Sequence, residues 1–292
     1  MPIFKQPSQV SINESEFCLF RNYIAEHSGI VISREKTYLL ETRLSKHMAQ
    51  VGIETFGKFY DYIIADNSLQ MMQKIVNAIT TNETKWFRDN EPWTVLENDI
   101  LPSLIEDISL GKRNKVRIWS AAASTGQEIY STVMCVDNYL RKNNIHSVKL
   151  SDFEFFATDI SSDVLDIAKK GRYDKISMSR GLSDFYIERY FKQKGTSWDI
   201  DEKIRTAVEF RAFNLQNPFT CFEKFDIIFC RYILIYFSDE LKMEVIRKMH
   251  EALNNPGIVF TGTYALLDMF TDLYNSNSCG NITYYQKREM LK

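Results

Sequence analysis

Residues 116–131 constrain the fold of this chain more than any other stretch. They begin with β-forming side chains from Val116 to Trp119, continue through a loop of small residues that ends at Gly126, and become helical from Gln127. A strand, a tight loop and a helix in this order form the first unit of a nucleotide-type site, where backbone N–H groups approach a ligand beyond the carboxyl end of the strand. One glycine is a weak form of this signature, because close packing of a helix on a strand also requires small residues.

Strand-like and helix-like segments alternate through the rest of the chain. We expect strands at residues 117–121, 153–158, 208–215, 225–230, 258–261 and 282–286. Helices are expected from Gln127, after Ser161 or Ser162, and after Ser238. This alternation predicts an α/β fold with a mostly parallel sheet and helices on both faces. Residues 172–207 form an insertion that is longer than a simple crossover and rich in aromatic and charged residues.

Residues 14–80 show helical periodicity throughout. Apolar residues recur at helical spacing in four segments, which predicts a small helical bundle. The second segment carries Lys36, Arg43 and Lys46, and the last two lie within one helical turn of each other. Taken alone, such a basic face is most often a solvated surface. We expect a helical domain with its linker at residues 1–90 and a second domain at residues 91–292.

The composition excludes several classes of protein. A hydrophobic content of 45%, a charged content of 25% and a net charge of −2 are those of an ordinary soluble protein, without a global attraction to nucleic acid. The five cysteines are scattered and form no Cys-x-x-Cys pair, which favours free thiols in a reducing cytoplasm. The N-terminus has no signal pattern, and the most apolar run, residues 225–237, is too short and too charged to span a membrane.

Polar groups that suit a ligand gather in two places. Residues 80–89 combine hydroxyl, amide, aromatic and guanidinium side chains, although Asn82 could instead cap a helix while Trp86 fills the core. Asp159 follows the second predicted strand, where a carboxylate commonly accepts hydrogen bonds from the ribose of a nucleoside cofactor. A helix cap is the alternative role for Asp159. The sequence has no Walker loop, no Gly-x-Ser-x-Gly and no His-Glu-x-x-His.

Five blocks of sequence resemble the signature blocks of the CheR type of chemotaxis receptor methyltransferases. They are residues 81–88, 117–128, 157–161, 214–215 and 225–237. The blocks occur in the family's order, and with the helical front domain the resemblance covers residues 14–287. It implies a class I S-adenosylmethionine-dependent methyltransferase fold: a Rossmann-like, mostly parallel sheet with an N-terminal helical domain and a small β insertion.

The resemblance also implies an activity and a site. The reaction is methylation of glutamate side chains on chemoreceptors, with S-adenosyl-L-methionine as cofactor, S-adenosyl-L-homocysteine as product and no metal. The family's cofactor contacts match Asn82, Thr84, Arg88, Glu128, Asp159, Asn214, Leu215, Arg231 and Tyr232. Its catalytic helpers match Arg88 and Tyr236, and its receptor-facing basic surface matches Lys36, Arg43 and Lys46.

The implied partner is the acidic, glutamate-bearing cytoplasmic helical bundle of a chemoreceptor. Neither nucleic acid nor membrane insertion is expected, and the protein is expected to be a cytoplasmic monomer. The insertion lacks the glycine-rich turn that the family uses to bind a receptor tail, because Gly195 is its only glycine after Gly181. The sequence therefore does not predict docking through a tethered pentapeptide.

Three departures from the family pattern lie near the expected cofactor pocket. Tyr232 stands where the family usually has Asn, Gln127 and Ile129 replace Glu and Pro, and residues 262–265 replace a Gly-His-Ser-Glu segment. Two rival functions stay open as a result. One is a weakly active or inactive module that binds S-adenosylmethionine or its product and docks to a signalling partner. The other is a methyltransferase acting on another protein or on a small carboxylate.

Catalysis is favoured over the first rival by the retained Arg88, Asp159 and Tyr236. A glutamate side chain has a reference pKa of about 4.3, so it is already an anion at neutral pH and needs no general base. The lack of a catalytic His or Cys therefore agrees with this chemistry, and Arg88 and Tyr236 are expected to orient the reacting groups.

Overall fold

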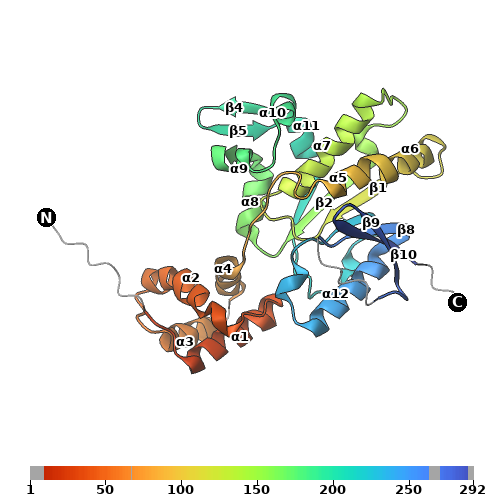
Figure 1. Ribbon diagram of the computed structural model, residues 1–292. Helices are drawn as coiled ribbons and strands as arrows, with labels where there is room; N and C mark the ends of the chain where they lie inside the picture. Colours follow the sequence, from red (N-terminus) through yellow and green to blue (C-terminus); the bar gives the residue numbers. More distant parts are fainter. Residues whose placement is uncertain (1–9, 67, 263–269, 289–292) are drawn as a thin grey trace. The chain divides into compact units, whose positions relative to one another are not determined.

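The computed structural model describes residues 10–66, 68–262 and 270–288 (Figure 1). Internal contacts divide the chain into two compact units. The helical unit runs up to Thr81 and includes Tyr236–Leu241, and the sheet unit comprises Asn82–Ile235 with the residues from Lys242 onward. Within the described ranges, no helix is both long enough and apolar enough to cross a membrane.

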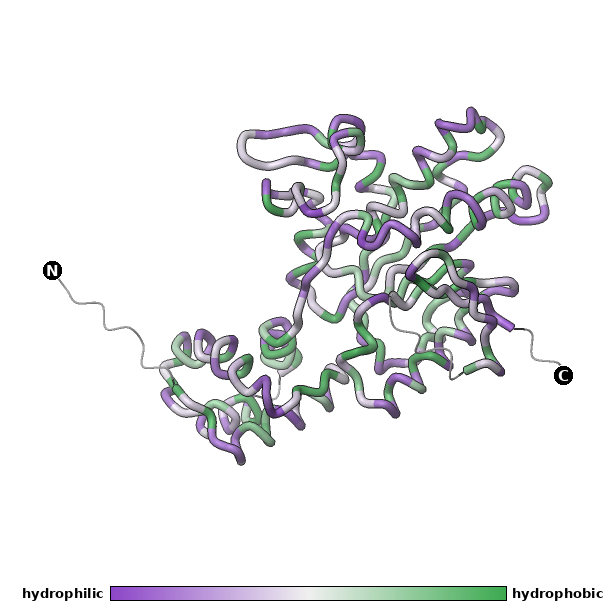
Figure 2. The backbone as a smooth tube through the Cα atoms, in the orientation of Figure 1, coloured by the Kyte–Doolittle hydropathy of each residue, from purple (hydrophilic) through white to green (hydrophobic). Residues whose placement is uncertain are grey.

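The helical unit contains the four predicted helices. They are α1 (Glu14–Ser28), α2 (Thr37–Gln50), α3 (Phe56–Asp66) and α4 (Leu69–Ile79), with a 3-10 turn, η1 (Arg34–Lys36), before α2. A capping box starts α1, because the Asn13 side chain accepts from Glu16 N and the Glu16 side chain accepts from Asn13 N. Gly29, with φ 74°, ends the same helix. Phe20, Leu44 and Ile75 are fully buried at the centre of the bundle, and Figure 2 shows α4 as largely hydrophobic.

The sheet unit is built on a seven-stranded sheet with the order β6-β2-β1-β7-β8-β10-β9. Its strands are β1 (Val116–Ser120), β2 (Phe153–Asp159), β6 (Val208–Ala212), β7 (Phe225–Phe229), β8 (Leu253–Phe260), β9 (Tyr274–Cys279) and β10 (Ile282–Lys287). The neighbouring strands β6, β2, β1, β7 and β8 pair in parallel, whereas β10 pairs antiparallel with both β8 and β9. The α/β fold with a mostly parallel sheet is therefore confirmed.

Helices cover both faces of the sheet, so its central strands are buried on both sides. The helices that cover it are α5 (Glu91–Val95), the π-helical η2 (Leu96–Ile100), α6 (Leu101–Ser109), α7 (Gln127–Lys142), η3 (Leu150–Asp152), α8 (Ser162–Lys170) and η4 (Phe219–Cys221). The next two, η5 (Leu234–Tyr236) and α12 (Asp239–Ala252), have residues in both units. Ile118 of β1 packs in one core with residues of α5, α6 and α7. The next residue, Trp119, points to the other face and stacks on Phe225 with 5.1 Å between ring centroids.

The predicted insertion folds as a small three-stranded antiparallel sheet with short helices. It consists of β3 (Arg172–Asp174), α9 (Lys175–Ser179), α10 (Asp184–Tyr190), β4 (Phe191–Lys194), β5 (Ser197–Ile200) and α11 (Glu202–Thr206). A buried carboxylate on α7, Asp137, holds the insertion by accepting from Lys203 Nζ (2.8 Å) and from the Tyr190 hydroxyl (3.0 Å).

Two features of the sheet differ from the prediction. Strand β8 begins at Leu253, whereas residues 254–257 were expected to form the turn that ends the preceding helix. Strand β9 was not expected at all, because its polar sequence lacks a clear alternation.

Of the departures from the family pattern, Ile129 is fully buried in the core, and Thr263–Ala265 lie outside the described residues.

Candidate functional site

The loop between β1 and α7 lies at the carboxyl ends of the parallel strands. Its first residue, Ala121, donates its N–H to the Phe229 carbonyl (2.8 Å) and so ties the loop to β7. Gly126 has φ 93°, and a Cβ added there would lie 3.0 Å from the Cβ of Ala168 on α8. Glycine is therefore required at this position both by its backbone conformation and by the close approach of α8.

Asp159 ends β2 and is buried beside this loop. Its Oδ2 accepts from Ser124 N (2.8 Å), and its Oδ1 accepts from Ser161 N (2.9 Å). Burial raises the pKa of the carboxyl group, while these backbone hydrogen bonds oppose the rise. Each carboxylate oxygen has a second lone pair, so Asp159 can accept ribose hydroxyls while it holds the loop.

Two serine hydroxyls complete this part of the site. Ser124 Oγ donates to the Asn82 carbonyl (2.9 Å), which brings the predicted cofactor segment to the same loop. Ser161 occupies the N-cap position of α8 but makes no side-chain cap hydrogen bond, and its buried Oγ has no partner among the described residues. An orphaned hydroxyl two residues after Asp159 fits a site that is completed by a polar ligand.

Asn214 and Leu215 follow β6 at the same edge of the sheet. The register pairs Ala212 with Asp159, so the next residues of the chain continue past the carboxyl end of β2. Leu215 is buried, and Asn214 Oδ1 accepts from Gln216 N (3.0 Å). A buried carboxylate, a small-residue loop and a buried apolar residue at one strand edge suit the ribose and base of an adenosyl group.

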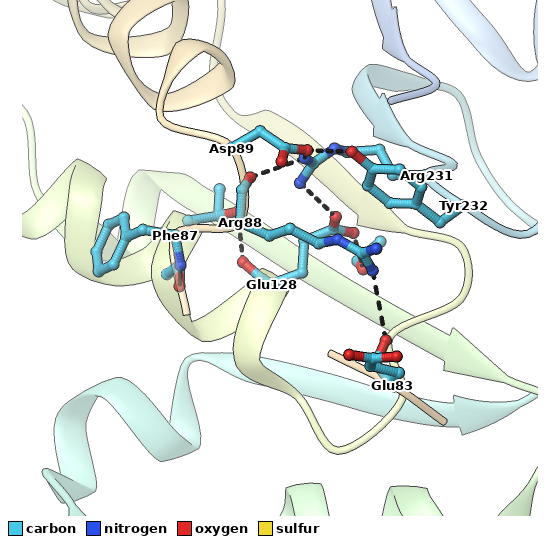
Figure 3. A network of polar contacts seen from close by, with 10 residues as sticks. Glu83, Phe87, Arg88, Asp89, Glu128, Arg231 and Tyr232 are labelled. Atoms are coloured by element: carbon cyan, nitrogen blue, oxygen red, sulfur yellow. Dashed lines mark hydrogen bonds and ion pairs between the residues drawn. The ribbon is translucent and has the colours of Figure 1, made fainter. Parts of the chain in front are cut away.

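The predicted residues Arg88, Glu128, Arg231 and Tyr232 meet in one polar network (Figure 3). The Arg231 side chain is only 1% exposed; its Nη1 lies 3.1 Å from Glu128 Oε2, and its Nη2 lies 2.6 Å from Asp89 Oδ2. The same Nη2 donates to the Arg88 carbonyl (2.7 Å). These protein groups use both Nη atoms, whereas the buried Nε of Arg231 has no partner among the described residues.

Backbone strain concentrates in the same network. Phe87, Asp89 and Tyr232 have φ values of 44°, 55° and 60°, in the left-handed region. That region costs a residue with a side chain about 1–2 kcal/mol. The segment is held by specific contacts, among them the hydrogen bond from Phe87 N to Ser131 Oγ (3.0 Å). Strained residues persist where their surroundings over-determine them, and they cluster at binding and catalytic sites.

A cavity of about 160 Å³ opens next to this network. It is lined by Glu83, Thr84, Lys85, Arg88, Asp89, Arg180 and Tyr232. Arg180 belongs to the insertion, where its Nη2 lies 2.8 Å from Glu83 Oε1 and its carbonyl accepts from Trp86 N (3.0 Å). The cavity therefore combines three cationic side chains with two carboxylates.

Several cavity residues were missed by the sequence analysis. Glu83, Lys85 and Asp89 lie within or next to a block that had already been singled out, so their proximity could have been anticipated. Arg180 had no such signal, because its contact with Glu83 spans 97 residues.

The remaining predicted residues belong to the helical unit. Tyr236 belongs to the helical unit, where its carbonyl accepts from Val31 N (2.8 Å). Lys36 and Lys46 are exposed. Arg43 is half-buried, and its Nη1 donates to the carbonyls of Ile79 (2.6 Å) and Thr80 (2.8 Å), where it caps the end of α4. The docking roles of these three residues stay predictions.

The fold and the cofactor edge define a class I, Rossmann-like methyltransferase. The family model described as "CheR methyltransferase, SAM binding domain" matches residues 82–281, and the one described as "CheR methyltransferase, all-alpha domain" matches residues 15–80. This chain belongs to the CheR methyltransferase family, as the sequence blocks predicted. It is an S-adenosylmethionine-dependent methyltransferase, and no group of three or more metal-ligating side chains occurs in the described part of the chain.

Curated relatives match along almost their whole length. The chain is 38% identical over 280 residues to chemotaxis protein methyltransferase Cher2 of Pseudomonas putida, covering 96% of this chain and 100% of the relative. It is 40% identical over 271 residues to chemotaxis protein methyltransferase 1 of Pseudomonas aeruginosa, covering 92% and 97%. It is also 34% identical to the chemotaxis protein methyltransferase of Vibrio parahaemolyticus, covering 92% and 96%.

Proposed function

We propose that this protein transfers the methyl group of S-adenosylmethionine to glutamate side chains of chemoreceptors. Membership of the CheR methyltransferase family and the names of the curated relatives support a role in chemotaxis. The glutamate acceptor is supported by the charge of the cavity beside Arg88, which is the observation that carries the proposal.

The cavity suits one acidic side chain. Its volume of about 160 Å³ is well below the roughly 300 Å³ at which pockets for drug-sized ligands begin. Of its two carboxylates, Asp89 pairs with Arg231 and Glu83 pairs with Arg180. The lining has three cationic side chains, Lys85, Arg88 and Arg180, against these two carboxylates, and this positive excess favours a carboxylate over a neutral or cationic acceptor.

The ion pair between Glu83 and Arg180 is exposed enough for an incoming carboxylate to replace Glu83. The two side chains are 69% and 42% exposed. Pairs in such positions contribute only about 0–1 kcal/mol. An incoming glutamate can therefore replace Glu83 beside Arg180 with little loss of stability.

The cofactor supplies an electrophilic methyl group on a sulfonium sulfur, and its transfer to a carboxylate oxygen leaves S-adenosylhomocysteine without moving a proton. Asp159, Asn214 and Leu215 are proposed to hold the adenosyl group. Arg88 is proposed to orient the acceptor through its planar fork of N–H donors, which matches the geometry of a carboxylate. Very strong pairing would stabilise the anion and slow its attack, so orientation rather than charge neutralisation is the role assigned to Arg88.

The proposed partner is the acidic cytoplasmic bundle of a chemoreceptor. The protein is proposed to be a cytoplasmic monomer, which places it in the same compartment as that bundle. Lys36 and Lys46 are exposed and have no side-chain ion pair within the described ranges, so they can pair with acidic residues of such a bundle. Arg43 would first have to leave the carbonyls that end α4. We therefore assign the docking contribution mainly to the two lysines.

The test is transfer of labelled methyl from S-adenosylmethionine to a receptor cytoplasmic fragment from the same cell, followed by mild alkali. A carboxyl methyl ester releases its label as methanol in base, whereas a methylated amine keeps it. Arg88→Ala should abolish the label. Arg211→Ala should not, because Arg211 is a surface residue that pairs with Glu209.

Label that survives alkali would overturn the glutamate assignment. Absence of label from the wild type, with cofactor binding shown by calorimetry in the same sample, would instead support the module that binds the cofactor and docks to a partner.

A further inference from the structure

The ring of Tyr232 packs directly against the guanidinium of Arg88. The Cζ atom of Arg88 lies over the ring, 3.6 Å from its centroid, which is a close cation–π contact. The ring is confined by other contacts. A Cβ added at Gly262 would lie 3.2 Å from the Tyr232 Cζ, and the Tyr232 hydroxyl donates to Asp89 Oδ2. Figure 3 shows Tyr232, Arg88 and Asp89 together.

A stack of this kind fixes the plane of a guanidinium and leaves its donors usable. The N–H groups of arginine point outward in the plane of the group, whereas the ring contacts only its face. One such donor of Arg88 is in use, because its Nη1 donates to the Glu83 carbonyl at 3.4 Å. That contact is long and restrains Arg88 weakly, so among the described residues the ring of Tyr232 is the stronger restraint on the guanidinium.

The strained backbone supports the same role. Tyr232 has φ 60°, a conformation that asparagine adopts more readily than tyrosine. Tyrosine at this position tolerates the left-handed backbone less well than asparagine, but only an aromatic side chain can stack on Arg88. The hydroxyl also binds the carboxylate that Arg231 holds, so the ring is tied to the buried part of the network.

We infer that Tyr232 is a positioning residue that holds the Arg88 guanidinium in the plane in which it binds the acceptor carboxylate, rather than a ligand of the cofactor. This inference rests on the proposed function of Arg88. It predicts that removing the ring affects the productive orientation of the acceptor and leaves cofactor affinity almost unchanged.

The experiment compares wild type, Tyr232→Leu and Tyr232→Phe in the full chain. Nuclear magnetic resonance of labelled arginine reports the ring-current shift of the Arg88 side chain, with Arg88→Lys used for assignment. Calorimetry gives the dissociation constant of S-adenosylmethionine. Labelled methyl transfer to the receptor fragment gives kcat and KM for the acceptor.

We expect Tyr232→Leu to lose the ring-current shift and to lower kcat/KM by roughly 10-fold, mainly through kcat, with cofactor affinity within about 2-fold of wild type. Tyr232→Phe keeps the ring and should restore the shift and most of the rate. Weaker cofactor binding in Tyr232→Leu, with the Arg88 resonances unmoved, would overturn the inference. A wild type without base-labile label would refute the proposed function, while the Arg88 shift would still decide whether the ring holds the guanidinium.

Discussion

Replacement of Arg231 by methionine should destabilise the sheet unit more than any surface change. The guanidinium is 1% exposed and compensates two carboxylates, Glu128 and Asp89, whose side chains are only 12% and 23% exposed. Methionine fills a similar volume but leaves both carboxylates without their cation. Loss of one partner of a buried pair typically costs about 3–5 kcal/mol. The lower end applies here, because Asp89 keeps the Tyr232 hydroxyl and Glu128 keeps the Ser120 hydroxyl.

A loss of about 3 kcal/mol corresponds to a fall in Tm of roughly 6–12 °C for a domain of this size. Urea unfolding followed by tryptophan fluorescence measures the free energy, and differential scanning calorimetry measures Tm. The matched control is Arg211→Met, because the ion pair of Arg211 with Glu209 is 48% and 58% exposed and should contribute less than about 1 kcal/mol.

A double-mutant cycle identifies the cause. Adding Asp89→Asn to Arg231→Met removes one of the uncompensated charges, so the double variant should lose at least about 1 kcal/mol less than the sum of the single losses. The reasoning is refuted if Arg231→Met is no less stable than Arg211→Met, or if the two single losses simply add.

Three further predictions concern other parts of the chain. Gly126→Ala should weaken S-adenosylmethionine binding in calorimetry by about 10-fold, because it adds a clash with α8 to the strain of φ 93°. The control is Gly195→Ala, where φ is 62° and an added Cβ would have no atom within 4 Å. That variant carries the strain alone and should bind the cofactor normally. Arg43→Ala should lower the free energy of unfolding of the helical unit in urea by about 2 kcal/mol, because the carbonyls at the end of α4 lose their donor. Lys46→Ala, in contrast, should weaken receptor binding only at low salt. Burial lowers the pKa of His250, so the unfolded chain takes up a proton at a higher pH than the folded chain. Thermal stability should therefore fall as pH drops below about 6.5, and His250→Asn should reduce that slope; an unchanged slope would contradict the assignment.

The placement of Asp159 was predictable because it follows from the alternation of strands and helices. Parallel strands bring their carboxyl ends to one edge, so Asp159 after β2 had to lie near the loop that ends at Gly126. Asn214 was indicated only by the family resemblance, because the expected strand 208–215 had included it. The four helices of the first unit were equally accessible, since their buried residues recur at helical spacing and Asn13 supplies an N-cap.

Strand β9 was not accessible from local pattern. Asn and Ser are poor strand formers, and β9 pairs with β10 alone, so its existence depends on a neighbour that is itself placed by β8. The predicted start of β8 was wrong for a related reason. Asn254, Pro256 and Gly257 indicate a turn locally, but Leu253 pairs with Phe225 and continues the sheet. In both places tertiary pairing overrides propensity.

Two arginines had roles that no local pattern could indicate. Arg43 was expected on a docking surface and Arg231 beside the cofactor, and both assignments stay predictions. The structure adds that both side chains donate to main-chain carbonyls at the end of α4 or in the segment that follows it. Arg43 binds Ile79 and Thr80, where that segment begins, and Arg231 binds Arg88, near its end, across 143 residues. A guanidinium can bind several carbonyls at once because it carries five donors.

The anchoring explains how a strained segment can carry the predicted cofactor contacts. Left-handed φ values at Phe87 and Asp89 would relax if the segment were free, since each costs about 1–2 kcal/mol. Within the sheet unit, Arg231 donates to the Arg88 carbonyl, and Phe87 N donates to Ser131 Oγ. These two contacts restrain the backbone that carries Arg88. The precision of Arg88 as an orienting group would then depend on Arg231 as well, so Arg231→Met should lower kcat even in those molecules that remain folded.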